Sequence, residues 1–266
     1  MIVEKKYLFF KTANIILDDE KILPLLKSNK YSSIVVLSYN KLTLPEFLEY
    51  SKPTLLIDLR RSDDEIFSSF NDTTRNEIRK TLRDDQLRFI YKDSPDAEAY
   101  RVYSDFEYSQ GRLPVRMNLV IDTLFFGIVF NNEIISGIFV NKSYPYLRIR
   151  SIFSKRLKTE DREIYRIIAY STRRVVWEAC LWGKKNGYIS LDMASVNINN
   201  PKTESIAKFK MSFGKNLIPE YTYIYKSKPF AFFEKVVRIK VLLKKTIFKV
   251  KNTLHEITDR NKLPRK

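Results

Sequence analysis

YRIIAYSTRRVVWEACLWGKKNGYISLDMASVNINNPKTESIAKFKMSFG, residues 165–214, is the stretch that decides the fold. Its first half has the length and the apolar spacing of a long helix, which ends in a tight turn at Gly187. Residues 188–193 then predict a short strand, and a second, shorter helix ends at Gly214. The order helix, turn, strand, helix is typical of one half of a mixed α/β sheet, so we expect the upstream residues to supply the other half.

Length and composition indicate a globular protein with a substantial core. The 266 residues suit one large or two small domains, and 44% of them are hydrophobic. The single cysteine, Cys180, excludes an internal disulfide, and its apolar helical surroundings indicate a packed side chain. The N-terminal residues contain no apolar run as long as a signal peptide or a membrane span. We therefore expect a cytoplasmic protein.

Composition also argues against several enzyme classes. The only histidine, His255, lies in a charged segment near the C-terminus. This position argues against a Ser-His-Asp or Cys-His triad and against a His-Cys metal site, so we expect no metal. The sequence has no glycine-rich nucleotide loop of the Rossmann or Walker type. A catalytic base should therefore be Asp, Glu, Tyr, Lys or a water that they hold.

The net charge of +17 is concentrated near the C-terminus. Residues 226–266 contain thirteen Lys or Arg and three acidic residues, a net charge of +10, which leaves +7 for the preceding residues. Residues 229–254 repeat apolar side chains every three or four positions among lysines and arginines, as in a basic amphipathic helix. Such a helix can lie on an anionic membrane surface. We expect contact with the inner face of the plasma membrane, and the alternative is docking on the body or on a dimer partner.

The N-terminal third predicts a small α/β subdomain, residues 1–93. Its expected strands are residues 6–10, 32–39, 54–60 and 87–92, and its expected short helices are residues 22–26 and 44–50.

Two further helices are predicted within residues 62–84. Ser62 and Glu65 fit a capping box at the start of the first helix. The second helix, from Thr73 or Thr74, places Arg75, Arg79 and Arg83 on one face. Two interpretations remain for this arginine face: a solvated surface, or a site for a phosphate or carboxylate.

Residues 94–226 predict the core of the protein. Two apolar runs in residues 124–140 flank Asn131 and Asn132, which suit a two-residue hairpin turn because asparagine tolerates positive φ. A helix over residues 94–111 precedes this hairpin. The remaining expected elements are a strand at 146–154, a basic loop at 155–161, the long helix from Thr159 or Glu160, and a last strand at 222–225. This order is that of the GNAT acyltransferase core.

Four segments resemble the FemAB-like branch of the GNAT superfamily, whose best known members are the peptidoglycan-bridge aminoacyltransferases. The resemblance spans residues 54–225. The segments are LLIDLR with TRNEIRKTLR (55–60 and 74–83), GIVFNNEIISGIFV (127–140), VVWEACLWGKKNGYISLDMAS (175–195) and IAKFKMSFGKN (206–216). The resemblance implies an α/β (α+β) fold: a GNAT-like mixed sheet with flanking helices, a reduced N-terminal GNAT-like subdomain and, at residues 227–266, a C-terminal amphipathic helix.

The chain departs from the family pattern in three ways. Long members have two complete GNAT-like units and often a coiled-coil arm, whereas here the first unit is reduced and no arm is visible. KRLKTEDREIY, residues 155–165, replaces the glycine-rich pyrophosphate loop. Asp192 is followed by Met193, Ala194 and Ser195 where the family has glycines.

Acyl transfer to an amine requires a group that accepts a proton, a donor for the carbonyl oxygen, and contacts that hold both substrates together. Asp192, at a strand end beside a polar loop, is our first catalytic candidate, and the alternative is that it caps the loop. Glu178 is the second candidate, because a buried acid on the long helix indicates either function or a buried arginine partner. Tyr223 is the third, as an acid for the leaving thiolate or else as a packing residue.

The expected donor is an acyl-CoA, most simply acetyl-CoA. A helix N-terminus after a basic loop can hold its pyrophosphate, and the alternative is that the basic side chains pair with nearby acids. The candidate cofactor-binding residues are Lys155, Arg156, Lys158, Arg162 and Arg166.

The candidate substrate-binding residues are Arg75, Arg79, Arg150, Asn197 and Lys208. Lys208 and Lys210 flank Phe209, and the helical period places these two lysines on different faces. At most one of them should therefore point to the site.

These observations lead to three hypotheses about function. The first is an N-acyltransferase that modifies an amino sugar, nucleotide- or lipid-linked, in cell-surface polysaccharide synthesis. The second is an aminoacyl-tRNA-dependent transferase of the peptidoglycan-bridge type, with tRNA as a partner. The third is a catalytically inactive GNAT-like binding module at the membrane.

Overall fold

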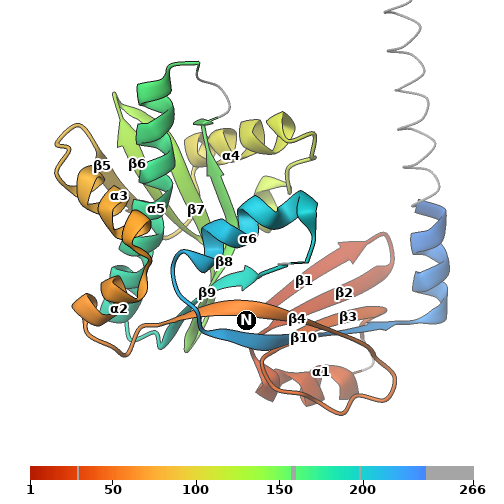
Figure 1. The fold of residues 1–266 in the computed structure, drawn as a ribbon. Helices are drawn as coiled ribbons and strands as arrows, with labels where there is room; N and C mark the ends of the chain where they lie inside the picture. The colour runs from red at the N-terminus through yellow and green to blue at the C-terminus, as the bar shows by residue number, and fades with distance from the viewer. Residues whose placement is uncertain (29, 157–159, 198, 238–266) are drawn as a thin grey trace, which may run out of the picture.

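The computed structural model describes residues 1–28, 30–156, 160–197 and 199–237 (Figure 1). Within these residues ten strands form one mixed sheet in the order β1-β2-β3-β10-β4-β9-β8-β7-β6-β5. The strands are β1 (Ile2–Tyr7), β2 (Phe10–Ile16), β3 (Ser33–Ser38), β4 (Leu48–Asp58), β5 (Arg88–Lys92), β6 (Leu124–Phe130), β7 (Glu133–Ser143), β8 (Tyr146–Ser154), β9 (Ser190–Ser195) and β10 (Leu217–Lys226). The helices are α1 (Ile22–Lys27), α2 (Asp63–Ser69), α3 (Asp72–Leu82), α4 (Ala97–Ser109), α5 (Arg162–Lys185) and α6 (Glu204–Met211), and residues 228–237 are also helical.

Helices cover both faces of the half of the sheet formed by β5 to β9. On one face, α5 packs with α2 and α3 over a core that includes Phe126 and Ile138. On the other face, α4 packs over a second core that includes Phe125 and Phe139. Successive positions along β6 thus point to opposite cores, as strand geometry requires. The result is a helix–sheet–helix arrangement (Figure 1), and the expected mixed sheet with flanking helices is confirmed.

Local signals predicted several elements correctly. The β6–β7 hairpin turns at Asn131 and Asn132, whose φ values are 49° and 61°. Ser62 and Glu65 form the expected capping box at the start of α2. The decisive stretch, residues 165–214, folds as most of α5, then β9 and α6.

Two predicted elements are wrong. The expected strand at residues 6–10 is instead the end of the β1–β2 hairpin, in which Tyr7 pairs with Phe10 and Leu8 has a φ of 55°. Apolar residues occupy this turn, so composition gave no sign of it. The expected helix at residues 44–50 is a turn at 45–47, and the long strand β4 begins at Leu48. Pairing of β4 with β10 along these residues outweighs the local helix-start signal of Pro45.

One continuous sheet contains strands from both predicted segments, 1–93 and 94–226. β4, from the first segment, lies between β9 and β10 of the second. The division into these two domains stays a prediction. Of the expected amphipathic helix at 229–254, residues 229–237 are described and helical, and the others lie outside the described residues. In the described part of the chain, no helix has both the length and the apolar character that a membrane span needs.

The packing of β6 and β7 generates a stability prediction. Gly127 and Gly137 face each other in the hairpin, and a Cβ at Gly137 would lie 2.7 Å from Cε2 of Phe125 and 2.9 Å from Cζ of Phe153. Both rings are buried, so neither can move away freely. Gly137→Ala should lower the free energy of unfolding by about 1–3 kcal/mol, measured by urea denaturation.

Ser136→Ala, on the same strand, is the matched control. Its buried hydroxyl has no hydrogen-bond partner among the described residues, so its loss should leave stability unchanged or slightly higher. Equal stabilities of Gly137→Ala and Ser136→Ala would contradict this packing account.

Candidate active site

The candidate site lies where β8 and β9 stop pairing. Within the described residues these parallel strands pair at three positions only, and the last pair is Arg148 with Asp192. β8 then continues to Ser154 and β9 to Ser195 without pairing to each other. In open α/β sheets, ligands bind at the carboxyl ends of strands, and the separation of β8 from β9 provides such a place at the centre of the sheet (Figure 1).

A buried network of charged groups occupies the last paired position. Asp192 is fully buried, and the guanidinium of Arg148 donates hydrogen bonds to both Asp192 and Glu220. These contacts join β8, β9 and β10 through side chains. Burial opposes the charge on Arg148, but Asp192 and Glu220 together raise the pKa of its guanidinium. The arginine therefore stays charged between two carboxylates.

Three hydroxyl groups complete the network. Tyr39 donates to Oδ2 of Asp192 at 2.8 Å, and Thr54 donates to Oδ1. Ser195 donates to Oε1 of Glu220 at 2.9 Å. Burial, with the nearby Asp192 carboxylate, raises the pKa of Tyr39, so this hydroxyl keeps its proton and remains a donor. Every carboxylate oxygen of Asp192 and Glu220 thus has a donor, as buried charges require.

Lys210, on α6, lies beside this network. Its Nζ donates to the backbone oxygen of Ser195 at 2.9 Å. Burial lowers the pKa of Lys210 to about 8, while Asp192 and Glu220 act in the opposite direction. An amine with this pKa can accept a proton near neutral pH and, once protonated, can donate one. Lys210 is therefore the group of the network that is suited to proton transfer.

Two further cations, Arg150 on β8 and Lys5 on β1, interact with each other. Arg150 follows Arg148 by two residues on β8, at a β-bulge where the pairing with β7 skips from Ile149 to Ser151. Burial lowers the pKa of Arg150, and burial together with the charge of Arg150 lowers the pKa of Lys5 on β1. Among the described residues, neither cation forms an ion pair with a carboxylate. Two partly buried cations without such a partner are suited to hold an anionic group.

The three catalytic candidates fall in three different places. Asp192 is in the network, and its Oδ1 also accepts from the backbone N–H of Ala194 at 2.7 Å, so it caps the loop as well. Glu178 instead pairs with Arg174, with Oε1 and Nε 3.1 Å apart, which is the buried arginine partner that the sequence suggested. Arg174 also donates to the backbone oxygen of Thr81, so this pair fastens α5 to the end of α3.

Tyr223 has a structural role. Its hydroxyl accepts a hydrogen bond from the backbone N–H of Leu42 at 2.6 Å, and its ring packs in a core with Ile15 and Val36. On β10 it is an odd number of residues from Glu220, so the two side chains point to opposite faces.

The cofactor candidates lie around the start of α5. Lys155 pairs with Glu133 at 2.6 Å, and Arg156 lies over the ring of Tyr165 at 4.6 Å. Arg162 and Arg166 are exposed, and Lys158 lies outside the described residues. Asp161 caps the helix by accepting from the N–H groups of residues 163 and 164. This acidic cap occupies the place where a pyrophosphate would be expected, and cofactor binding by these residues stays a prediction.

Among the substrate candidates, Arg150 lies on β8 two residues after Arg148 and interacts with Lys5. Arg75 donates to the backbone oxygens of Ser68 and Phe70 and so holds the α2–α3 connection. Arg79 lies over the ring of Phe67 at 5.1 Å. 

Lys208 is exposed and pairs with Glu204 at 2.7 Å, whereas Lys210, on the other face of α6, points to the network. Asn197 is exposed in the loop after β9.

Sequence reasoning missed Arg148, Glu220, Tyr39 and Thr54. A charged residue in the middle of each of two apolar strands, β8 and β10, was the available signal. Such isolated charges predict a buried ion pair, but the identity of the partner depends on which strands come together.

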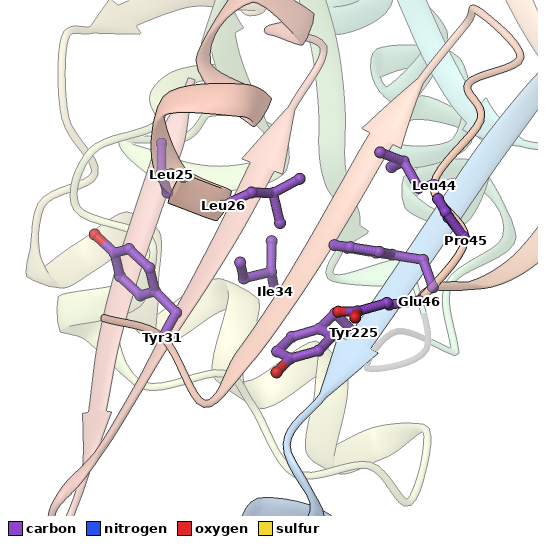
Figure 2. A pocket seen from close by; sticks show the side chains of 9 residues that line it. Leu25, Leu26, Tyr31, Ile34, Leu44, Pro45, Glu46 and Tyr225 are labelled. Carbon is purple, nitrogen blue, oxygen red and sulfur yellow. The ribbon is translucent and has the colours of Figure 1, made fainter. Parts of the chain in front are cut away.

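Two pockets lie away from the network. The first, of about 340 Å³, is lined mainly by apolar side chains of α1, β3, β10 and the loop before β4 (Figure 2). Among the described residues that line it, Glu46 is the one with a charge. The second, of about 430 Å³, lies between β4, α2 and the α6–β10 loop and includes Arg61 and Lys215. Neither pocket is lined by a residue of the charged network.

No protein-family model matches the sequence, and no curated protein matches it. The crystal structure of FemX matches with a TM-score of 0.56 at 11% identity, over 83% of each chain. The chain has the fold of FemX. The C-terminal domain of an Agrobacterium fabrum protein assigned to lysylphosphatidylglycerol synthetase also matches, with a TM-score of 0.52 at 12% identity, over 90% of this chain and 84% of that one. At these identities the likeness establishes the fold, and in this respect the FemAB-like resemblance of residues 54–225 is confirmed.

The charged network generates a second stability prediction. Asp192→Asn removes one of the two buried carboxylates and brings an amide with its own donors close to Arg148. The free energy of unfolding should fall by about 3–5 kcal/mol, measured by urea denaturation.

Asp58→Asn is the matched control, because Asp58 pairs with Arg60 at 2.8 Å on the surface. An exposed pair contributes about 1 kcal/mol or less, so this variant should stay close to the wild type. If both variants are equally stable, the network does not hold the three strands together.

Proposed function

We propose that the chain is an N-acyltransferase whose reaction takes place beside Lys210, Asp192 and Glu220. The observation that carries the proposal is the position of Lys210, an amine with a pKa of about 8, where β8 and β9 separate. The fold shared with FemX supports the same reaction class, because the FemAB-like resemblance of residues 54–225 implies acyl transfer. A thioester donor such as acetyl-CoA would supply the activated acyl group.

Lys210 acts first as the base. In its neutral form it takes a proton from the ammonium group of the acceptor, so that the nitrogen can attack the acyl carbon. As the N–C bond forms and the C–S bond breaks, the proton passes from Lys210 to the leaving thiolate. Lys210, neutral again, then takes the second proton from the amide nitrogen and releases it to solvent. Asp192 and Glu220 counteract the effect of burial on the pKa of Lys210, and Arg148 donates hydrogen bonds to both carboxylates.

The acceptor in this proposal is an amino sugar that carries a phosphate or diphosphate, nucleotide- or lipid-linked. Arg150 and Lys5 support this choice, because they are partly buried cations that interact with each other and have no carboxylate partner among the described residues. A diphosphate would provide their countercharge. The FemAB-like resemblance supports a role for this reaction in cell-surface polysaccharide synthesis at the cytoplasmic side of the membrane.

A second candidate function is aminoacyl transfer from tRNA. The match to FemX and the net charge of +17 favour it. A tRNA complex should weaken steeply with salt, because phosphate contacts release counterions. A screen of acetyl-CoA against amino-sugar nucleotides, read as free thiol, distinguishes the two functions. Turnover only with aminoacyl-tRNA would replace the first proposal.

A binding module without catalytic activity is the third candidate. The acidic cap at Asp161 and the absence of a glycine-rich loop favour it. A chain that binds an acceptor but turns over neither acyl-CoA nor aminoacyl-tRNA would support this alternative.

The role of Lys210 predicts a specific pH dependence. Because burial lowers its pKa to about 8, Lys210 is half neutral at that pH and mostly protonated below it. The value of kcat/KM should therefore rise with pH to about 8 and then level off. Lys210→Met should lose about 10²–10⁴-fold in kcat, measured with the acceptor found in the screen.

Lys208→Met is the matched control, since Lys208 is on the same helix but exposed. It should keep most of the activity and the same pH profile, and both variants should melt cooperatively. An active Lys210→Met enzyme would refute Lys210 as the base.

A further inference from the structure

Exposed apolar side chains from two distant segments lie at one end of the sheet. Leu8 and Phe9 form the turn between β1 and β2, and they are 69% and 79% exposed. Phe232, in the helical residues 228–237, is 70% exposed. Figure 1 shows the β1–β2 hairpin next to this helix. We call Leu8, Phe9 and Phe232 the aromatic edge.

Aromatic contacts hold the two segments together. The ring of Phe10 lies 5.4 Å from that of Phe230 and 5.1 Å from that of Phe233. Phe9 contacts Phe10 at 4.9 Å, and Phe230 is buried. The aromatic edge therefore belongs to one packed unit. The turn itself is unusual, because such two-residue turns normally contain Gly, Asn or Asp rather than Leu and Phe.

Exposed lysines surround the aromatic edge. Lys6 and Lys11 pair across the hairpin, next to the turn, and Lys228 and Lys235 are on the helix. None of these four forms an ion pair among the described residues. The nearby acids are already engaged: Glu4 accepts from Tyr31, and Glu234 pairs with Lys226. The surroundings of the aromatic edge are therefore strongly basic.

We propose that the aromatic edge inserts into the surface of an anionic lipid bilayer. Leu8, Phe9 and Phe232 would enter the boundary between headgroups and acyl chains, and the four lysines would contact the anionic headgroups. Lysine is depleted at protein–protein interfaces but attracted by anionic lipid, so this composition favours a membrane over a protein partner. The inference rests on the described residues alone and does not depend on the proposed acyltransferase activity.

The test is vesicle co-sedimentation of the full chain. Vesicles of equal parts phosphatidylglycerol and phosphatidylcholine should bind the wild type, and vesicles of phosphatidylcholine alone should bind it much more weakly. The variant Leu8→Ala/Phe9→Ala/Phe232→Ala should have an affinity for the anionic vesicles at least about tenfold lower than that of the wild type, because most of the inserted apolar area is lost. The matched control, Tyr108→Ala/Leu113→Ala/Ile121→Ala, removes exposed apolar side chains elsewhere and should bind like the wild type.

A second measurement reports insertion directly. In anionic vesicles, brominated acyl chains should quench the fluorescence of the tryptophan introduced by Phe9→Trp. The fluorescence of the tryptophan introduced by Leu113→Trp should not be quenched. Equal binding of the wild type and the aromatic-edge variant would overturn the proposal and assign the binding to other residues. The proposal would also be overturned, in favour of self-association, if the wild type did not bind vesicles and instead formed a dimer that Phe232→Ala dissociates.

Discussion

The hydrogen bonds of Arg148 to Asp192 and Glu220 are the interaction on which the centre of the structure depends. They join β8, β9 and β10, and Thr54 of β4 and Tyr39 attach to the same network. Buried charges destabilise a fold unless each one has a partner. Removal of one partner leaves the other charge buried and unpaired, and its desolvation then lowers the free energy of unfolding. The buried charges are therefore paired only when strands from the N-terminal and C-terminal parts of the chain are assembled in the same sheet.

The same network creates the chemical environment of Lys210. β8 and β9 separate directly after the position of Arg148 and Asp192, so the charged groups lie where the sheet opens. α6 brings Lys210 to this point and buries its amine, which lowers its pKa to about 8. Fold stability and candidate catalysis therefore depend on the same few side chains, as is common where pKa values are perturbed.

Sequence reasoning succeeded where the deciding signal is local. The asparagine turn of the β6–β7 hairpin and the capping box of α2 need only neighbouring residues, and both were predicted. For Glu178 the sequence left two alternatives, a catalytic role or an arginine partner, and in the structure Glu178 pairs with Arg174. Sequence reasoning failed where long-range pairing decides. Arg148 and Glu220 are far apart in the chain, and only the strand order shows that they meet. The apolar turn at Leu8 likewise resembled a strand, because no turn-forming residue marks it.

Photoaffinity labelling is the most direct test of the proposal that the acyl donor reacts where β8 and β9 separate. An acyl-CoA analogue with a diazirine at the end of a short acyl chain can be cross-linked to the full chain and mapped by mass spectrometry. Labels should appear on β8 after Arg148, on β9 after Asp192, or on α6 around Lys210, and excess acetyl-CoA should suppress them. Labels confined to the pocket beneath α1 (Figure 2), or no competed labels at all, would contradict it.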